Sequence, residues 1–313
     1  MSGKRIAIIF LLSVMTCITV FTAKNTDFTD EDSQFVEIND LSVHYNLFGE
    51  ETDTLFLMLH GFGSSTFTWS FVQEDLANRG TVLAYDRPAF GLTERVPKIK
   101  DFDYNPYDFY YQSELAKALI EELGFEDKEL IIIGHSAGTP VALDFYDQYP
   151  EKVKGLVLIA PALFHYLDEN PFARFIKNPI LRATASLFKG ALANRLEEGL
   201  DESWYDPSKI TPELREEYKK FTKIDDWDKA LFEFTLNQGD FNMEPVLEKV
   251  DVPTLVIMGK YDAVIDDKEI ESLVSDNEHI DYYLIDETGH VPHEETPDEV
   301  SAIIEGWLES IIE

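Results

Sequence analysis

The feature that most constrains the fold is a strand-like run that passes directly into a serine flanked by glycines. Residues 129–133 read ELIII, a β-branched run typical of a strand buried on both faces. GHSAG follows at 134–138, and residues 139–149 have helical spacing. So sharp a turn lifts the serine clear of the sheet, and glycines two residues to either side avoid collisions with the neighbouring strand or helix. The pattern predicts a nucleophile at Ser136.

Strand-like and helix-like segments alternate along most of the chain. Apolar or alternating runs bounded by glycines and turns predict strands, and segments of helical spacing between them predict helices, the last over Pro297–Ile312. Such alternation indicates a mostly parallel, doubly wound sheet with helices on both faces. The predicted strands are 35–40, 41–49, 54–62, 81–91, 129–138, 153–162, 252–262 and 279–286.

The strand pattern is interrupted once, after the sixth predicted strand. Between Pro161 and about Asn242 it vanishes, and helical spacing with aromatic faces takes its place at 172–199 and 212–239. An inserted helical segment of this length is expected to fold over the carboxyl edge of the sheet as a cap. The sequence therefore predicts an α/β core of residues 35–160 and 243–313 and a helical cap of residues 161–242.

The N-terminus carries an apolar segment. Lys4 and Arg5 precede the uncharged run Ile6–Ala23, whose length falls between a secretory signal and a membrane span. A cleaved signal peptide and an uncleaved anchor at 1–23 stay open as alternatives, with a lipoprotein site at Cys17 less favoured. Residues 24–34 form an acidic linker. Each of these alternatives predicts export, with the globular part outside the cytoplasm, secreted or membrane-anchored.

Composition excludes several classes of function. The chain has 60 Asp and Glu against 26 Lys and Arg, a net charge of −34, which disfavours nucleic acid as a partner. Cys17 is the only cysteine. The globular part therefore has no disulfide, zinc-thiolate site or cysteine nucleophile. Oligomeric state is left open by these observations.

A serine hydroxyl needs a base, and the base needs an orienting carboxylate. Asp262 ends one late predicted strand and His290 follows another, so both are expected at the carboxyl edge of the sheet, where ligands bind. Their order in the chain, serine then aspartate then histidine, fits this arrangement. The alternatives are Asp266 and Asp267 for the acid and His293 for the base.

Attack of the serine on a carbonyl group creates an oxyanion, and the loop after the third predicted strand is expected to help stabilise it. His60-Gly61-Phe62-Gly63 ends the third predicted strand, and its glycines allow the backbone to approach a substrate closely. The backbone N–H groups of Phe62 and Ala137 are the predicted donors. His60 itself is interpreted as structural rather than as a base.

With these residues, the sequence resembles the α/β-hydrolase superfamily over nearly all of 35–313. It is most similar to the cap-bearing group of C–C bond hydrolases, cofactor-free haloperoxidases and esterase-like hydrolases. The resemblance implies the α/β-hydrolase fold, a Ser136–His290–Asp262 triad and the two oxyanion donors. Ala89 is a departure, because many relatives have glycine there. The matched motifs are HGFG at 60–63, DRPAFG at 86–91, GHSAG at 134–138, GKYD at 259–262, and GH at 289–290 with Glu295 and Pro297.

The expected reaction is acyl transfer from a small carbonyl substrate to water, without a metal or organic cofactor. The favoured substrate is a carboxylic ester with an apolar acyl or aromatic group. C–C bond cleavage, peptide hydrolysis and perhydrolysis stay open as alternatives. Serine at 136 disfavours the aspartate-nucleophile mechanism of epoxide hydrolases and dehalogenases. Aromatic residues of the cap are candidate substrate contacts, or else they hold the cap on the core: Phe164, Phe172, Trp204 and Phe232.

Overall fold

The computed structural model describes residues 28–165, 174, 176–178, 180, 184 and 186–312. The predicted signal peptide or anchor at 1–23 and the candidate contact Phe172 lie outside these residues. Among the helices of the described ranges, none has the length and apolar character needed to span a bilayer.

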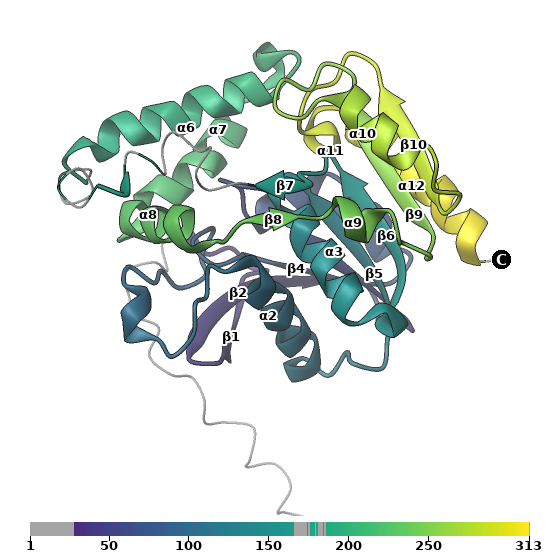
Figure 1. Cartoon of the computed structure of the whole chain (residues 1–313), viewed down its shortest axis with the longest axis horizontal. Helices are drawn as coiled ribbons and strands as arrows, with labels where there is room; N and C mark the ends of the chain where they lie inside the picture. Colours follow the sequence, from purple (N-terminus) through teal and green to yellow (C-terminus); the bar gives the residue numbers. More distant parts are fainter. Residues whose placement is uncertain are drawn as a thin grey trace, which may run out of the picture.

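An eight-stranded sheet forms the centre of the molecule (Figure 1). Its order is β1-β2-β4-β3-β5-β6-β9-β10, with β2 antiparallel to β1 and β4 and every other neighbouring pair parallel. The predicted mostly parallel sheet is therefore confirmed. The strands are β1 (Gln34–Ile38), β2 (Leu41–Phe48), β3 (Thr54–Leu59), β4 (Thr81–Tyr85), β5 (Glu129–His135), β6 (Val153–Ile159), β9 (Thr254–Gly259) and β10 (Ile280–Ile285).

Helices cover both faces of the sheet because the side chains of each buried strand alternate between two apolar layers. In β3, the leucines at 55, 57 and 59 pack toward α2 (Phe109–Glu122) and α3 (Thr139–Gln148). Phe56 and Met58 pack on the other side, toward α12 (Pro297–Ile312). The remaining helices of the core are α1 (Gln73–Ala77), α9 (Glu244–Leu247), α10 (Asp267–Val274) and α11 (Pro292–Glu295).

Short 3₁₀ helices complete the connections between these elements. The segment between β3 and β4 contains a 3₁₀ turn, η2, and the short α1, with Val72 between them. Asp108 caps α2 by accepting from the backbone N–H groups of Tyr110 and Tyr111. The 3₁₀ helices are η2 (Thr66–Phe71), η3 (Ile99–Asp101), η4 (Ser136–Gly138), η5 (Pro150–Lys152), η7 (Ser186–Phe188), η8 (Pro207–Lys209) and η9 (Phe221–Lys223).

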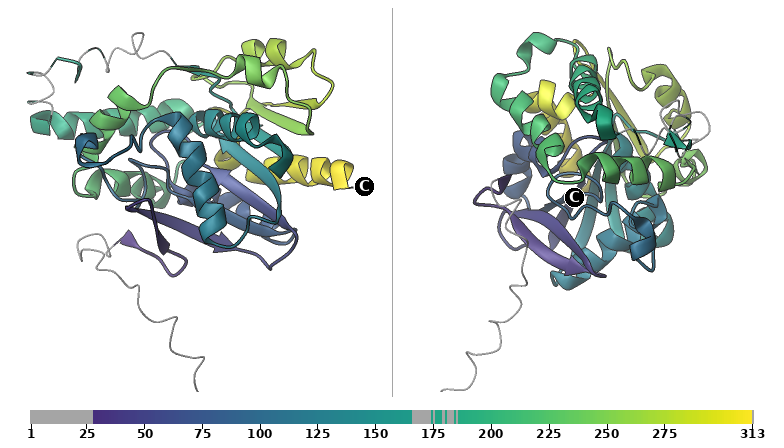
Figure 2. Two further views of the ribbon diagram at one scale, coloured as in Figure 1. Left: turned by 60° about the horizontal axis from the view of Figure 1, so that its bottom comes forward. Right: turned by 90° about the vertical axis from the view of Figure 1, so that its left-hand side faces the viewer.

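Between β6 and β9 the described chain is mainly helical, with α6 (Lys189–Ser203), α7 (Pro212–Lys220) and α8 (Trp227–Asn237). Figures 1 and 2 show α6 and α7 lying together at one end of the molecule, outside the sheet. The expectation that 161–242 contains no strand is wrong at its two ends. There β7 (Phe164–His165) pairs antiparallel with β8 (Phe241–Asn242), where the chain leaves the core and returns. Strands of two residues are too short to show a period in the sequence.

Candidate active site

The turn after β5 holds Ser136 in a strained conformation. Its φ of 48° lies in the left-handed region, which costs a residue other than glycine about 1–3 kcal/mol. The glycines on either side are required by packing, as predicted. A Cβ at Gly134 would lie 3.0 Å from the Cα of Thr139, and one at Gly138 would lie 2.1 Å from the carbonyl oxygen of Leu59. The turn therefore presses α3 against β3 and lifts Ser136 above the sheet edge.

Ser136, His290 and Asp262 form a hydrogen-bonded chain. Nε2 of His290 lies 2.9 Å from Oγ of Ser136, and its Nδ1 lies 2.8 Å from Oδ2 of Asp262. The Asp262 side chain is fully buried, and its Oδ1 accepts from the backbone N–H groups of Val264 and Ile265. A carboxylate acting only as acceptor makes Nδ1 the donor, which leaves Nε2 free to accept the serine proton.

Backbone contacts between two late loops bring the acid and the base together. A Cβ at Gly259, the last residue of β9, would lie 2.0 Å from the carbonyl oxygen of Gly289. The N–H of Tyr261 also donates to the carbonyl oxygen of Thr288 at 2.9 Å. The loop that carries Asp262 is thus joined along its backbone to the loop that carries His290.

The alternative acids and base have other roles in the structure. Asp266 caps α10 by accepting from the N–H of Lys268, and Asp267 lies in the first turn of that helix. Nε2 of His293 lies 2.8 Å from Oγ1 of Thr68. Burial lowers the pKa of His293 to about 3, so its ring stays neutral near pH 7.

The loop after β3 lies against the serine. A Cβ at Gly61 would lie 2.8 Å from Nδ1 of His135 and 3.2 Å from Cβ of Ser136, so the backbone there is in close contact with the turn. Phe62 follows, and its half-exposed side chain lines the cavity beside Ser136. Ala137 lies in η4, which leads directly into α3.

His60 supports that loop from behind. Its Nδ1 lies 2.7 Å from the carbonyl oxygen of Gly61, and its Nε2 accepts from the N–H of Arg87. Burial lowers the pKa of His60 to about 4, and the charge of Arg87 adds to this effect. A neutral ring whose two nitrogens both form hydrogen bonds fits the interpretation of His60 as a structural residue rather than a base.

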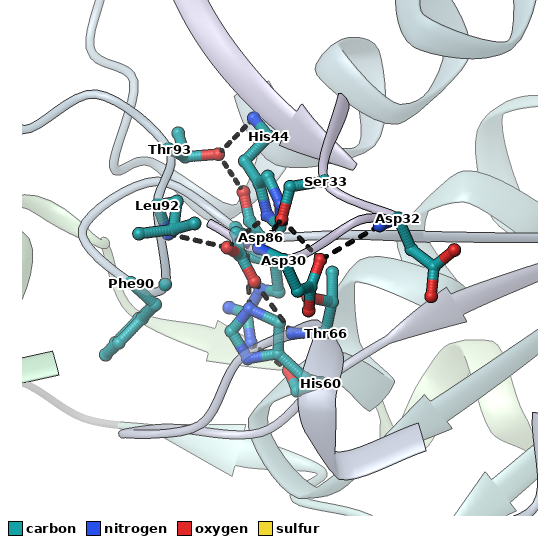
Figure 3. A network of polar contacts seen from close by, with 12 residues as sticks. Asp30, Asp32, Ser33, His44, His60, Thr66, Asp86, Phe90, Leu92 and Thr93 are labelled. Atoms are coloured by element: carbon teal, nitrogen blue, oxygen red, sulfur yellow. Dashed lines mark hydrogen bonds and ion pairs between the residues drawn. The ribbon is translucent and has the colours of Figure 1, made fainter. Parts of the chain in front are cut away.

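A buried carboxylate, that of Asp86, organises the turn after β4 and connects this turn to β2 and η2 (Figure 3). Asp86 accepts from the N–H groups of Thr66 and Leu92, and its Oδ2 lies 2.6 Å from Nδ1 of His44. Burial alone would raise the pKa of Asp86, but its interactions with His44, with His60 and with the N–H of Leu92 together outweigh burial, and the pKa is about 2. In this turn Ala89 has a φ of 80°, in the left-handed region where glycine is favoured.

A cavity of about 540 Å³ opens beside Ser136 and His290. Apolar side chains line it, together with charged side chains of α6, α7 and η9. The charged groups are largely paired: Arg195 lies 2.9 Å from Glu202, and Lys219 lies 3.1 Å from Glu197. The apolar lining residues are Phe62, Ala193, Leu196, Leu200, Phe221, Val264 and Val291.

Three of the aromatic side chains proposed as substrate contacts are described by the structure, and they lie outside this cavity. Trp204 is buried among Leu200 and other apolar side chains of the insertion, and Phe232 is buried against Ile176. Phe164 is exposed on β7. None of these three aromatic residues is among the described residues that line the cavity. For Trp204 and Phe232, the structure therefore favours the alternative that the aromatics pack the cap.

Several residues near the site were given no role by the sequence. The cavity side of α6 is formed by Ala193, Leu196 and Leu200, whose spacing of three and four residues could have identified them as one helix face. Glu295 binds backbone N–H groups, which leave no pattern in a sequence. In the described ranges, no group of three or more His, Cys, Asp or Glu residues is arranged to hold a metal ion.

Residues 56–303 match the model of a family described as the alpha/beta hydrolase family. The chain is 26% identical to the dihydrolipoyllysine-residue acetyltransferase component of the acetoin cleaving system of Pseudomonas putida, over 81% of this chain and 63% of that protein. It thus spans less than two thirds of that relative. It is 24% identical to monoacylglycerol lipase ABHD6 of Homo sapiens, over 82% of this chain and 75% of the lipase.

Solved structures show the same fold. A thermophilic esterase from Thermogutta terrifontis superposes with a TM-score of 0.73 at 20% sequence identity, covering 89% of this chain and 99% of the esterase. At this identity the likeness shows the arrangement of strands and helices alone.

Proposed function

The chain belongs to the alpha/beta hydrolase family, and from that premise we propose that it is a serine hydrolase acting on a carboxylic ester with an apolar acyl or aromatic group. The observation that carries the proposal is the hydrogen-bonded chain Ser136–His290–Asp262, whose serine and histidine line a cavity. A serine in contact with a buried, oriented imidazole is the arrangement that acyl transfer requires.

In the proposed first step, Oγ of Ser136 attacks the carbonyl carbon while Nε2 of His290 takes the hydroxyl proton. Asp262 holds the imidazole in the required tautomer and stabilises its charged form. His290 then protonates the leaving alcohol, which departs as the tetrahedral intermediate collapses to an acyl-enzyme. Water, deprotonated by the same His290, then attacks the acyl carbon. The bond between the acyl carbon and Oγ breaks as His290 returns the proton to Ser136, and the acid is released.

The oxyanion would be held by the backbone N–H groups of Phe62 and Ala137. Two features support this part of the proposal. Ala137 precedes α3, where a helix N-terminus favours negative charge, and the close contact at Gly61 sets the other loop beside Ser136. Each such donor typically contributes about 10²–10³ in rate.

The lining of the cavity supports an apolar substrate group. The side chains of Leu200, Val264 and Val291 lie in the same cavity as Ser136 and His290. An acyl chain or aromatic ring placed there would be removed from water, which stabilises binding by about 25 cal/mol per Å² of apolar surface.

The nucleophile can be tested by covalent labelling. We expect a fluorophosphonate probe to label the folded protein, and Ser136→Ala to abolish labelling and lower ester hydrolysis by roughly 10⁴–10⁶-fold. Ser272→Ala is the matched control, because Ser272 is exposed on α10 and should leave both readouts unchanged. Absence of Ser136-dependent labelling in folded protein would sink the proposal.

A substrate panel tests the reaction class. Nitrophenyl esters from acetyl to dodecanoyl should be hydrolysed with a preference for longer acyl groups, because these fill more of the apolar cavity. A dienoic ketone assayed alongside them distinguishes ester hydrolysis from C–C bond cleavage. Turnover of the ketone alone would replace the ester proposal by the C–C hydrolase alternative.

A further inference from the structure

Glu295 lies at the end of α11, is 7% exposed, and joins two segments that are far apart in the sequence. Its Oε2 accepts from the N–H of Gly289 at 2.8 Å and from the N–H of Tyr205 at 3.0 Å. Its Oε1 accepts from the N–H of Asp206 at 2.9 Å. One buried carboxylate thus receives three backbone donors, one from the loop that carries His290 and two from the segment that follows α6.

The same two segments also contact each other directly. The backbone N–H of His290 donates to the carbonyl oxygen of Ser203, the last residue of α6, at 2.7 Å. At Gly289 there is no space for a side chain, because a Cβ would lie 2.5 Å from that carbonyl oxygen and 2.7 Å from the backbone nitrogen of Tyr205. The segment 203–206 therefore packs on the backbone of the His290 loop.

The contact between segment 203–206 and the His290 loop is called the junction below, and the negative charge of Glu295 strengthens it. Hydrogen bonds from N–H groups to a carboxylate are roughly twice as strong as those between neutral groups, and burial excludes competing water. Glutamine at this position would have one oxygen in place of two and would turn an NH₂ group toward backbone donors. Glu295→Gln is therefore expected to loosen the junction while keeping the size of the side chain.

We propose that Glu295 is a positioning residue for the base His290, which it holds in place by tying the cap segment 203–206 to the His290 loop. This inference rests on the proposed function, since it assigns a role around the base of that reaction. Nε2 of His290 must stay within hydrogen-bond reach of Ser136, and displacements near 1 Å cost roughly 10²-fold in rate. The cap thus contributes to the chemical step as well as to the cavity.

The test compares Glu295→Gln with Glu299→Gln, an exposed carboxylate at the start of α12. For Glu295→Gln we expect kcat for a nitrophenyl ester to fall by roughly 10–100-fold with KM changed much less, and fluorophosphonate labelling to slow in parallel. Glu299→Gln should match the wild type. A folded Glu295→Gln protein with wild-type kcat, or with a change in KM alone, would overturn the inference.

Gly289→Ala tests the same junction from its other side, because the added methyl group would push segment 203–206 away while Glu295 is intact. The double variant should lose little more than either single variant, since both changes break one contact. Fully additive losses would contradict the inference.

Hydrogen exchange on the wild type tests the junction without a variant. The amides of Tyr205, Asp206, Gly289 and His290 should exchange slowly and at similar rates, and fast exchange at 205–206 beside protected 289–290 would contradict the junction. If the wild type shows no Ser136-dependent labelling, the proposed function and this inference both fail. If it labels and only the Glu295 predictions fail, the proposed function stands.

Discussion

At the residue scale, the site depends on side chains whose burial changes their chemistry. His60 and His293 are fully buried, and burial lowers the pKa of each well below that of a free imidazole. The hydrogen bond to Ser136 comes from His290, whose Nε2 lies 2.9 Å from Oγ. The position of His290 after a late strand favoured it over His293 as the base already in the sequence.

Glu294 is a second buried carboxyl group in this region, one residue before Glu295. Its Oε1 accepts from the hydroxyl groups of Thr68 in η2 and of Tyr218 on α7, so it joins these two segments. Within the described part of the chain, its Oε2 has no hydrogen-bond partner. Burial raises the pKa of Glu294 to about 7, although both hydroxyl groups act in the opposite direction.

This pKa predicts a pH-dependent stability. Between the unfolded pKa of about 4.3 and the folded value near 7, the folded protein holds a proton that the unfolded chain has lost. The stabilisation is therefore full below about pH 4.3 and is lost as pH rises through 7. Glu294→Gln has no proton to lose at this position. We therefore expect its free energy of unfolding, relative to that of the wild type, to increase from pH 5 to pH 8 by at most on the order of 3 kcal/mol.

Thermal unfolding of both proteins at the two pH values measures this gain. Glu299→Gln serves again as the exposed control and should show the same difference from the wild type at pH 5 and pH 8. An equal difference for Glu294→Gln at both pH values would show that Glu294 is ionised in the fold across this range.

At the element scale, two glycines of the serine turn set how closely α3 approaches the sheet. Gly134 faces the start of α3 and Gly138 faces the end of β3. Their requirement was predictable from the sequence, because the strand and helix on either side of GHSAG are both strongly patterned. The ribbon of β7 and β8 was not predictable, since two-residue strands depend on tertiary pairing.

A pair of glycine substitutions tests this packing. Gly138→Ala would place a methyl group 2.1 Å from the carbonyl oxygen of Leu59, and we expect it to destabilise the protein by about 1–3 kcal/mol or more. Gly306 lies within α12 with no other atom near its added Cβ, so Gly306→Ala should stabilise by about 0.5–1 kcal/mol. Urea unfolding measures both changes. Tolerance of Gly138→Ala at full stability would contradict the close packing of α3 on β3.

At the scale of the whole molecule, acidic residues are in large excess, while basic residues of the inserted helices α6 and α7 form ion pairs with nearby carboxylates. The net charge is −34. Cations of α6 and α7 pair with nearby carboxylates, as in Arg215 with Asp201 at 2.5 Å. Exposed pairs of this kind contribute little each, so repulsion among the unpaired carboxylates should dominate the overall charge effect.

Salt is therefore expected to stabilise the protein. Raising sodium chloride from 0.02 to about 0.5 M shortens the screening length from more than 10 Å to a few Å, which reduces repulsion within the folded state. We expect the thermal midpoint to rise by several degrees, since about 1 kcal/mol corresponds to roughly 2–4 °C in a domain of 150–250 residues. Potassium chloride should act alike, because screening depends on ionic strength. A falling midpoint would show that favourable ion pairs outweigh repulsion.

The sequence by itself determined the sheet, the turn at Ser136 and the order of Ser136, Asp262 and His290. Ser136, Asp262 and His290 each come after a predicted strand, and an apolar or alternating run of this kind can be recognised without knowing the fold. Only the tertiary structure decided which side of the insertion lines the cavity and what Glu295 binds. Two of its three donors are the backbone N–H groups of Tyr205 and Asp206, about 90 residues away in the sequence. Every residue except proline carries such a group, so no pattern of side chains could have identified these partners.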